Sequence, residues 1–255
     1  MKDALLQVRG LAKRFGGLTA VRDLDFDLDE GEILGLIGPN GAGKTTTFNL
    51  IAGSYGADGG EIRFAGESIL GLAPHEIARH GVMRTFQHNR PFGGMRVLDN
   101  VLVGAHTRFR SSLWKVVAGI HHSEEMEQRR RAGQLIDFVG LGELRDADVG
   151  TLSFGQGRLL EIARALAGEP RLILFDEPAA GLTLAEAERI AGVIRDIAVR
   201  GIAVLLIEHD MRFLLPLAQR VVVLNFGARI AEGTPQQVRA HPAVVDAYLG
   251  DAAAL

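Results

Sequence analysis

Apolar and polar side chains alternate at the start of the chain, whereas later segments are apolar at nearly every position. The alternation runs through residues 5–15 and 20–32 and predicts antiparallel strands with one face in water. Continuous apolar runs lie within residues 33–38, 171–178 and 201–210. Such a run is typical of a strand that is buried on both faces. We therefore expect an antiparallel sheet followed by a covered, mostly parallel sheet.

Helical periodicity separates the buried strands. Leu159 and Leu166 are seven residues apart and belong to one apolar helical face, and Ser153 precedes them as a candidate helix cap. A second helix is expected to begin at Thr183, where Glu186 is placed three residues later for a capping box. Strands that alternate with helices in this way predict an α/β fold.

We interpret residues 1–255 as a single domain with two additions. Residues 88–157 are mostly helical and charged in pattern and are predicted to form an inserted helical subdomain. Residues 221–233 have the pattern of a hairpin, and residues 235–255 are expected to form a C-terminal helical extension.

The composition is that of an ordinary globular protein and excludes several classes. Of the 255 residues, 47% are hydrophobic and 23% are charged, and there is no cysteine, which excludes disulfides and thiolate metal sites. The net charge of −3 argues against a nucleic-acid binder with a broad basic surface. The N-terminal segment lacks the apolar core of a secretory signal, and the longest apolar runs are shorter than the roughly 20 residues of a membrane helix.

A glycine-rich segment after the first buried strand carries the strongest chemical signal. The sequence GPNGAGKTT at residues 38–46 fits the pattern G-x-x-x-x-G-K-S/T. Backbone N–H groups of such a loop surround phosphates, while Lys44 reaches the β- and γ-phosphates and the Thr45 hydroxyl coordinates Mg²⁺. The alternative is a glycine-rich turn with an exposed lysine, but the position between a buried strand and a helix favours a nucleotide site. The candidate nucleotide-binding residues are Gly38, Pro39, Asn40, Gly41, Ala42, Gly43, Lys44, Thr45 and Thr46.

Polar side chains at the ends of other buried strands are expected at the same sheet edge. Asp176 and Glu177 end the run LILFDE, and we expect Asp176 to hold Mg²⁺ and Glu177 to act as general base. His209 follows the next apolar run and is expected to contact the γ-phosphate. Gln87, after another expected strand, is a candidate contact for Mg²⁺ or the attacking water. Each of these residues alone would be an ordinary surface or strand-end side chain.

The segment LSFGQ at residues 152–156 predicts a second anion site. Ser153 is placed to cap the helix that follows, and Gly155 exposes backbone N–H groups at the positive end of the helix dipole. This segment lies more than a hundred residues after the glycine-rich segment GPNGAGKTT, which is called a P-loop below.

Together these elements resemble the nucleotide-binding subunits of ABC transporters, over essentially the whole chain. GPNGAGKT is similar to the Walker A motif, Gln87 to the Q-loop, LSFGQ to the signature, LILFDE to Walker B, and His209 to the switch histidine. The resemblance implies a P-loop NTPase (RecA-like) core with an antiparallel β subdomain and an inserted helical subdomain, which binds and hydrolyses ATP with Mg²⁺. It also implies that two subunits pack head to tail, so that the signature of one covers the ATP of the other. Ser153 and Gly155 would then contact the partner's γ-phosphate, with Gln156 beside them.

The resemblance extends to the adenine and to the branch of the family. Phe15 matches the aromatic residue that stacks on adenine, with packing in the core as the alternative, and Val21 is expected to line the same pocket. The segments LLEIARAL, LLIEHDM and AYLG look most like the LivG-type subunit of branched-chain amino acid importers. The same branch includes importers of urea and amides.

That branch implies specific partners and a location. They are a second ATP-binding subunit, the same chain or a LivF-like relative, two transmembrane permeases, and a periplasmic or extracellular solute-binding protein, with no nucleic acid. The chain would sit peripherally on the cytoplasmic face of the inner (plasma) membrane. Phe92, Met95 and Val97 follow Gln87 and would either receive a permease helix or pack inside the helical subdomain.

Two positions depart from the family pattern. Phe154 stands where the signature usually has glycine, and Thr183 stands where many members have aspartate. The rival functions are a non-transport ABC ATPase acting on DNA or ribosomes, a P-loop kinase or GTPase, and an adaptor that binds ATP without turnover. The lack of long coiled coils and of an N-K-x-D element, and the presence of Glu177 and His209, favour the transport ATPase.

Overall fold

A computed structural model of the chain describes residues 4–85, 91–105 and 121–248, without the side chains of residues 121–124. Its centre is a six-stranded sheet in the order β10-β9-β3-β8-β7-β6. The strands are β3 (Ile33–Ile37), β6 (Val82–Arg84), β7 (Leu172–Asp176), β8 (Ala203–Ile207), β9 (Arg220–Asn225) and β10 (Ala228–Gly233). All neighbours are parallel except β9 and β10, which form the expected hairpin. The predicted covered, mostly parallel sheet is confirmed.

The two faces of this sheet bury two separate apolar cores. Because side chains alternate along a strand, Leu34 and Leu36 of β3 face one core, where they meet Phe48. Ile33 and Ile37 face the other core. β3, β7 and β8 are buried at every position, as their continuous apolar sequences predict.

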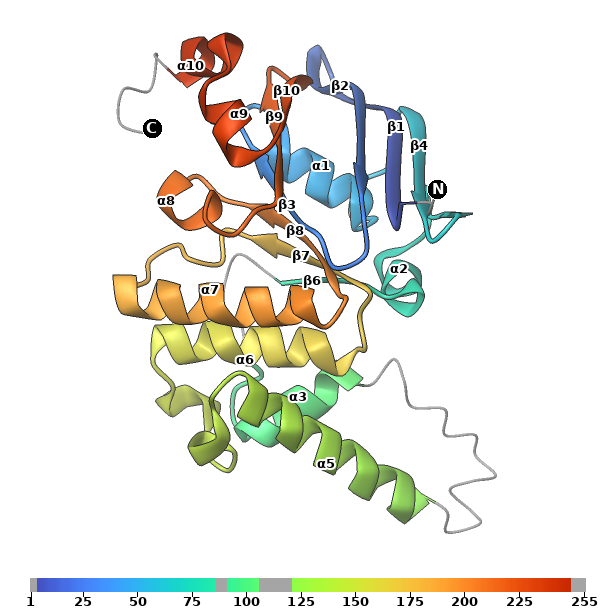
Figure 1. Ribbon diagram of the computed structural model, residues 1–255. Helices are drawn as coiled ribbons and strands as arrows, with labels where there is room; N and C mark the ends of the chain where they lie inside the picture. The colour runs from blue at the N-terminus through green and yellow to red at the C-terminus, as the bar shows by residue number, and fades with distance from the viewer. Residues whose placement is uncertain (1–3, 86–90, 106–120, 249–255) are drawn as a thin grey trace.

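The first core lies between the parallel sheet and a smaller antiparallel sheet. That sheet has the order β2-β1-β4-β5, with β1 (Leu6–Phe15), β2 (Leu18–Leu28), β4 (Gly59–Phe64) and β5 (Glu67–Ser68). Its strands have alternating burial, which confirms the expected wet face. Figure 1 shows α1 (Lys44–Ile51) beside this sheet, and Phe48, Leu50 and Ile51 of α1 belong to the same core.

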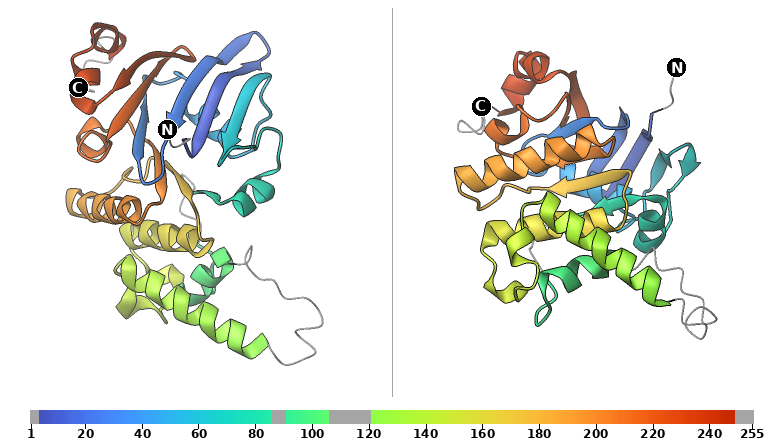
Figure 2. Two further views of the ribbon diagram at one scale, coloured as in Figure 1. Left: turned by 45° about the vertical axis from the view of Figure 1, so that its right-hand side comes forward. Right: turned by 60° about the horizontal axis from the view of Figure 1, so that its bottom comes forward.

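Helices cover the second face of the parallel sheet and extend away from it. These helices are α3 (Val97–Gly104), α5 (His121–Phe138), η2 (Gly142–Leu144), η3 (Val149–Thr151), α6 (Phe154–Ala167), α7 (Leu184–Val199), α8 (Met211–Leu214), α9 (Pro235–Arg239) and α10 (Pro242–Tyr248). The short helix α2 (Pro74–His80) instead packs on the first core through Ile77. Figures 1 and 2 show α3, α5 and α6 grouped on one side of the molecule, with α7 between α6 and the sheet. The boundary expected at residue 157 falls inside α6, because this helix runs without interruption to Ala167.

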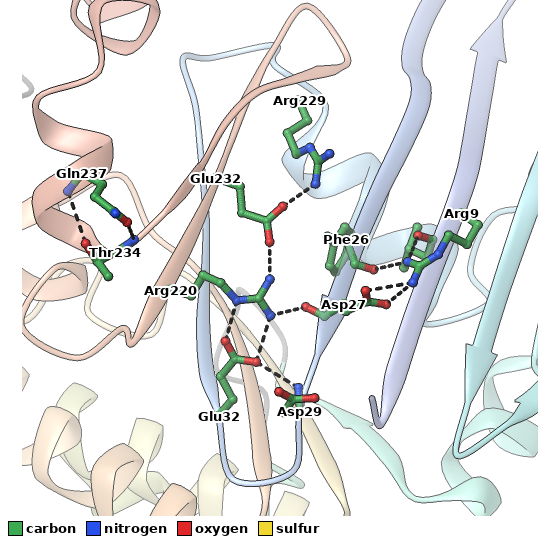
Figure 3. A network of polar contacts seen from close by, with 11 residues as sticks. Arg9, Phe26, Asp27, Asp29, Glu32, Arg220, Arg229, Glu232, Thr234 and Gln237 are labelled. Carbon is green, nitrogen blue, oxygen red and sulfur yellow. Dashed lines mark hydrogen bonds and ion pairs between the residues drawn. The ribbon is translucent and has the colours of Figure 1, made fainter. Parts of the chain in front are cut away.

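A polar network joins the hairpin edge of the parallel sheet to the antiparallel sheet (Figure 3). Arg220 at the start of β9 donates to both carboxylate oxygens of Glu32, at 2.9 and 3.0 Å, and to the carbonyl oxygen of Asp27 at 2.6 Å. It also pairs with Glu232 of β10. Burial by itself would lower the pKa of Arg220, but the hydrogen bonds that Arg220 donates to Glu32 and Glu232, together with their negative charges, outweigh burial and raise this pKa above its ordinary range.

Across the described ranges, no helix has the length and apolar character needed to cross a membrane.

Candidate functional site

The loop before α1 is shaped by glycines that no other residue could replace without strain. Gly38 has a φ of 151° and Gly43 a φ of 101°, in the region that favours glycine. A Cβ at Gly38 would press on the carbonyl oxygen of Leu224, and a Cβ at Gly43 on that of Ala20, each closer than the 3.0 Å that real Cβ atoms keep. The loop is therefore held against β9 and β2 by its backbone. It forms a cradle that only a chain without side chains at these points can make.

Lys44 begins α1 and lies across this loop. Its Nζ atom donates to the carbonyl oxygens of Gly38 and Pro39, at 2.5 and 2.9 Å, and only 9% of the residue is exposed. Burial lowers the pKa of Lys44, and the charges of Glu177 and Asp176 oppose this effect. A phosphate would give this desolvated ammonium a stronger partner than two carbonyl oxygens.

The remaining loop residues leave hydroxyl and N–H groups at the helix N-terminus. Thr45 and Asn40 are exposed, Thr46 is half-buried, and Ala42 is buried. Thr47 is structural, because its hydroxyl donates to the Gly43 carbonyl oxygen at 3.0 Å.

The carboxyl ends of β7 and β8 bring the expected catalytic side chains together. Asp176 is 3% exposed and ends β7. Glu177 follows with a φ of 49°, a conformation that costs a non-glycine residue roughly 1 kcal/mol or more and often marks a functional position. Its N–H donates to the carbonyl oxygen of Ile207 at 3.0 Å, which fixes the turn to β8. His209 lies with its Nδ1 atom 3.7 Å from Glu177 Oε1.

Glu208 is a buried carboxylate at this edge that the sequence patterns did not identify. Its residue is 1% exposed, and it accepts hydrogen bonds from the N–H groups of Ala179 at 2.9 Å and His209 at 3.2 Å. Burial raises the pKa of Glu208, and the N–H donors partly offset this effect. It joins the turn after Glu177 to the segment of His209. In the sequence, Glu208 is only a glutamate that directly follows an apolar strand. Such a position has many explanations, so it does not by itself identify a functional residue.

The segment LSFGQ caps α6 as predicted. The Ser153 hydroxyl accepts from the N–H of Gln156 at 3.2 Å, and Gln156 Oε1 accepts from the N–H of Ser153 at 2.8 Å. This capping box occupies the side chain of Gln156 at its own helix end.

The N-terminus of α6 packs against the N-terminus of α7. A Cβ at Gly155 would lie 2.5 Å from Glu186 Oε1. A Cβ at Gly181 would lie 3.3 Å from Cε1 of the Phe154 ring. Glu186 also completes the predicted capping box with Thr183, whose hydroxyl donates to it at 2.8 Å. The hydrogen bonds from Thr183, with a smaller contribution from the N–H of Gly155, lower the pKa of Glu186. The second anion site therefore has a carboxylate of its own chain beside it.

The structure places the two residues expected at an adenine pocket in different environments. Phe15 is 43% exposed and makes an edge contact with Tyr55, with ring centroids 5.4 Å apart, and Lys13 Nζ lies 5.4 Å from the Phe15 centroid. Phe15 is therefore a surface aromatic residue that a base can reach. Val21 is fully buried in the core between the sheets, so its side chain does not line a pocket.

The segment after Gln87, a candidate contact with a permease, is described from residue 91 onward. Gln87 itself lies outside the described residues. Phe92 is 47% exposed and Met95 is 39% exposed, whereas Val97 is fully buried against α6 and the rest of the second core. Val97 is thus a core residue, and only Phe92 and Met95 are available to a partner.

Comparison with known proteins identifies the family. The family model described as ABC transporter matches residues 21–180, and a model described as Branched-chain amino acid ATP-binding cassette transporter matches residues 228–254. The chain is 44% identical to the high-affinity branched-chain amino acid transport ATP-binding protein BraF of Pseudomonas aeruginosa, over 99% of this chain and 100% of that protein. It is 40% identical to the high-affinity branched-chain amino acid transport ATP-binding protein LivG of Escherichia coli, over 99% of this chain and 100% of LivG.

A solved structure gives the same result. The crystal structure of the ADP conformation of an ATP-binding cassette of an ABC transporter superposes with a TM-score of 0.86 and 33% sequence identity, covering 98% of this chain and 100% of that one. The P-loop cradle and the carboxylates at the ends of β7 and β8 are thus found in a chain whose full length matches such cassettes. This chain belongs to the ABC transporter family and is one of its ATP-binding cassettes.

Proposed function

We propose that this chain is the ATP-hydrolysing subunit of an importer for branched-chain amino acids or similar small solutes. The observation that carries the solute class is the match over residues 228–254, because the residues of the nucleotide site have no part in selecting a solute. Relatives of the same length that are named for branched-chain amino acid transport support the same assignment.

The nucleotide site fits ATP with Mg²⁺. The backbone cradle leaves no room for side chains at Gly38 and Gly43, and the buried ammonium of Lys44 faces the same loop. The Thr45 hydroxyl and the Asp176 carboxylate are hard oxygen ligands of the kind that Mg²⁺ prefers. Within the described residues no three histidine, cysteine, aspartate or glutamate side chains gather as a metal cluster, which agrees with an ion held largely by phosphates and water. When bound, Mg²⁺ neutralises charge on the β- and γ-phosphates.

The carboxylate edge supports hydrolysis. We assign Glu177 as the base that accepts the proton of the attacking water, and His209, 3.7 Å away, as the side chain that contacts the γ-phosphate. Lys44 stabilises the phosphate charge, and Phe15 supplies a face for adenine. Gln87 is proposed as a further contact for the metal or the water.

The signature is proposed to act on the ATP of a second ATP-binding subunit. The P-loop packs against Ala20 and Leu224, whereas Gly155 packs against Glu186, so the two anion sites are built on different elements of the chain. A head-to-tail pair, made with a second copy or with a LivF-like relative, brings Ser153 and Gly155 to the partner's γ-phosphate.

The working complex is proposed to contain two permeases and a periplasmic or extracellular solute-binding protein. The permeases would span the membrane, and the chain would bind them peripherally at the cytoplasmic face. Phe92 and Met95 are the candidate contacts with a permease.

Reconstitution tests this function. We would assemble the chain with its permeases, the second ATP-binding subunit and the binding protein in vesicles, and measure uptake of labelled leucine, urea and acetamide. We expect leucine uptake that requires ATP and Mg²⁺ and that is lost when Glu177→Gln replaces the native chain. Uptake of urea or acetamide without leucine would assign another solute. ATPase activity stimulated by DNA, with no uptake, would favour a non-transport ATPase.

A further inference from the structure

A partly buried arginine, Arg84, contacts the carboxylate that we assign to Mg²⁺. Arg84 ends β6, and its NH2 group donates to Asp176 Oδ2 at 2.8 Å. Its NH1 group donates to Asn49 Oδ1 of α1 at 2.6 Å. The guanidinium thus joins three segments that are far apart in sequence: the edge strand β6, the helix of the P-loop and the strand of Asp176.

Local structure explains how Arg84 reaches this place. β6 is parallel to β7, with Arg84 opposite Leu174, and the N–H of Thr85 donates to the Leu174 carbonyl oxygen at 3.0 Å. Both strands therefore end at the same edge of the sheet. Asn49 lies on α1, which begins at that edge, so the arginine side chain spans the sheet and the helix.

Burial makes the contact important. The side chains of Arg84 and Asp176 are only 18% and 3% exposed. Burying a carboxylate to this degree costs free energy unless a paired charge or hydrogen bonds replace its lost hydration. Lys44 is close enough to interact electrostatically with Asp176, but its ammonium donates to Gly38 and Pro39 instead. Within the described residues, Arg84 is the side chain that forms a hydrogen bond and an ion pair with Asp176.

We propose that Arg84 is a positioning residue for Asp176: it holds Oδ2 in a hydrogen-bonded ion pair and so fixes the carboxylate, which leaves Oδ1 for the metal site. This inference rests on the proposed ATPase function. Partners that hold a metal ligand from behind typically contribute 10–100-fold to metal affinity. The planar fork of arginine suits this role, because it reaches Asp176 and Asn49 at once, whereas the single ammonium of lysine does not form that fork.

Metal binding to the nucleotide complex tests the proposal independently of turnover. The purified full-length chain would be loaded with adenylyl imidodiphosphate, a non-hydrolysable ATP analogue, and titrated with Mn²⁺ under electron paramagnetic resonance. The dissociation constant of the analogue would also be measured in EDTA. We expect Arg84→Ala to raise the Mn²⁺ dissociation constant by about tenfold or more, with analogue binding in EDTA unchanged.

Three further variants sharpen the result. Arg84→Lys should raise the Mn²⁺ dissociation constant less than Arg84→Ala does, because its ammonium keeps a positive charge near Asp176. If Arg84→Ala does not fold, Arg84→Lys is the variant that tests the proposal. Asn49→Ala keeps the ion pair and should give a still smaller increase. Arg63→Ala on β4, whose side chain is 47% exposed and pairs with Glu61, is the matched control and should leave both constants unchanged.

The outcomes are distinct. An unchanged Mn²⁺ constant in a folded Arg84 variant overturns the proposal, and so does a lowered one, which would mean that Arg84 competes with the metal. Equal weakening of the analogue in EDTA and in Mn²⁺ would indicate general damage to the site and would also overturn it. Failure of the native chain to bind the analogue at all would contradict the proposed function instead.

Discussion

Two helix N-termini in this chain are built to face anions, and they are made in different ways. The loop before α1 is enclosed by the chain itself, because Gly38 and Gly43 pack on the carbonyl groups of Leu224 and Ala20 and because Lys44 is buried beside them. The N-terminus of α6 is capped by its own neighbours in sequence, Ser153 and Gln156, and the N–H of Gly155 faces Glu186 of α7.

The two anion sites differ in which groups the chain itself supplies and which must come from another molecule. At the P-loop, one chain supplies a cation, a backbone cradle and the carboxylates of Asp176 and Glu177, and the partner would add only its signature. The α6 site has an exposed hydroxyl and N–H groups but no cation from the described residues in its capping box, and Glu186 lies against Gly155. We therefore expect a single chain to bind a nucleotide at the first site, and we propose that the anion of the second site comes from a partner.

The largest effect is expected for Glu177→Gln. Loss of the general base should lower ATP turnover by about 10²-fold or more while ATP binding is retained. Turnover is measured as phosphate release, and binding is measured separately with a fluorescent nucleotide. Glu188→Gln on the exposed side of α7 is the control and should turn over normally. Equal turnover of Glu177→Gln and the native chain would remove Glu177 from the chemistry.

The next effect separates the two anion sites directly. Lys44→Ala removes a charge-assisted contact and should weaken ATP binding to the isolated chain by about 10- to 100-fold. Gly155→Asp should leave that affinity unchanged, because the P-loop is untouched, and should block ATP-driven pairing by like-charge repulsion. Calorimetry measures the first quantity and size-exclusion chromatography with ATP the second.

Gly155→Asp also places a carboxylate beside Glu186, so the variant is compared with Gly155→Asp combined with Glu186→Gln. We expect pairing to stay blocked in both. A loss of ATP affinity in the isolated Gly155→Asp chain would mean that α6 serves the nucleotide of its own chain.

A smaller effect is expected on stability at the first site. Gly43→Ala combines a left-handed backbone with a collision at Ala20 and should lower the free energy of unfolding by about 1–3 kcal/mol. Gly41 has a φ of 80° but no atom within 4 Å of an added Cβ, so Gly41→Ala should cost less. Urea unfolding followed by circular dichroism measures both. Equal losses would show that backbone conformation, not the close approach, limits the loop.

The smallest effect is expected at the second site. Ser153→Ala removes one cap and should lower the free energy of unfolding by about 1 kcal/mol, with ATP affinity of the isolated chain unchanged. The same urea titration measures it. A loss as large as that of Gly43→Ala would mean that the second site is as deeply built into the fold as the first.

The elements that depend on local chemistry are predictable from the amino-acid sequence. The caps at Ser153 and Thr183, the apolar strands β3, β7 and β8, and the hairpin of β9 and β10 follow from residue spacing, because hydrogen bonds and side-chain alternation act over a few residues. The P-loop was predictable for the same reason.

Contacts between distant segments are not predictable in this way, because they depend on how the whole chain folds. The sequence predicted that Val21 would line a ligand pocket, and it left open whether Val97 would face a partner or pack inside the helical subdomain. Packing against other elements buries both side chains. No local pattern indicates that Arg84 meets Asp176, that Glu208 accepts from Ala179, or that Glu186 lies on Gly155. Burial and ion pairing depend on which surfaces the fold brings together, and that is a property of the whole chain and not of any one segment.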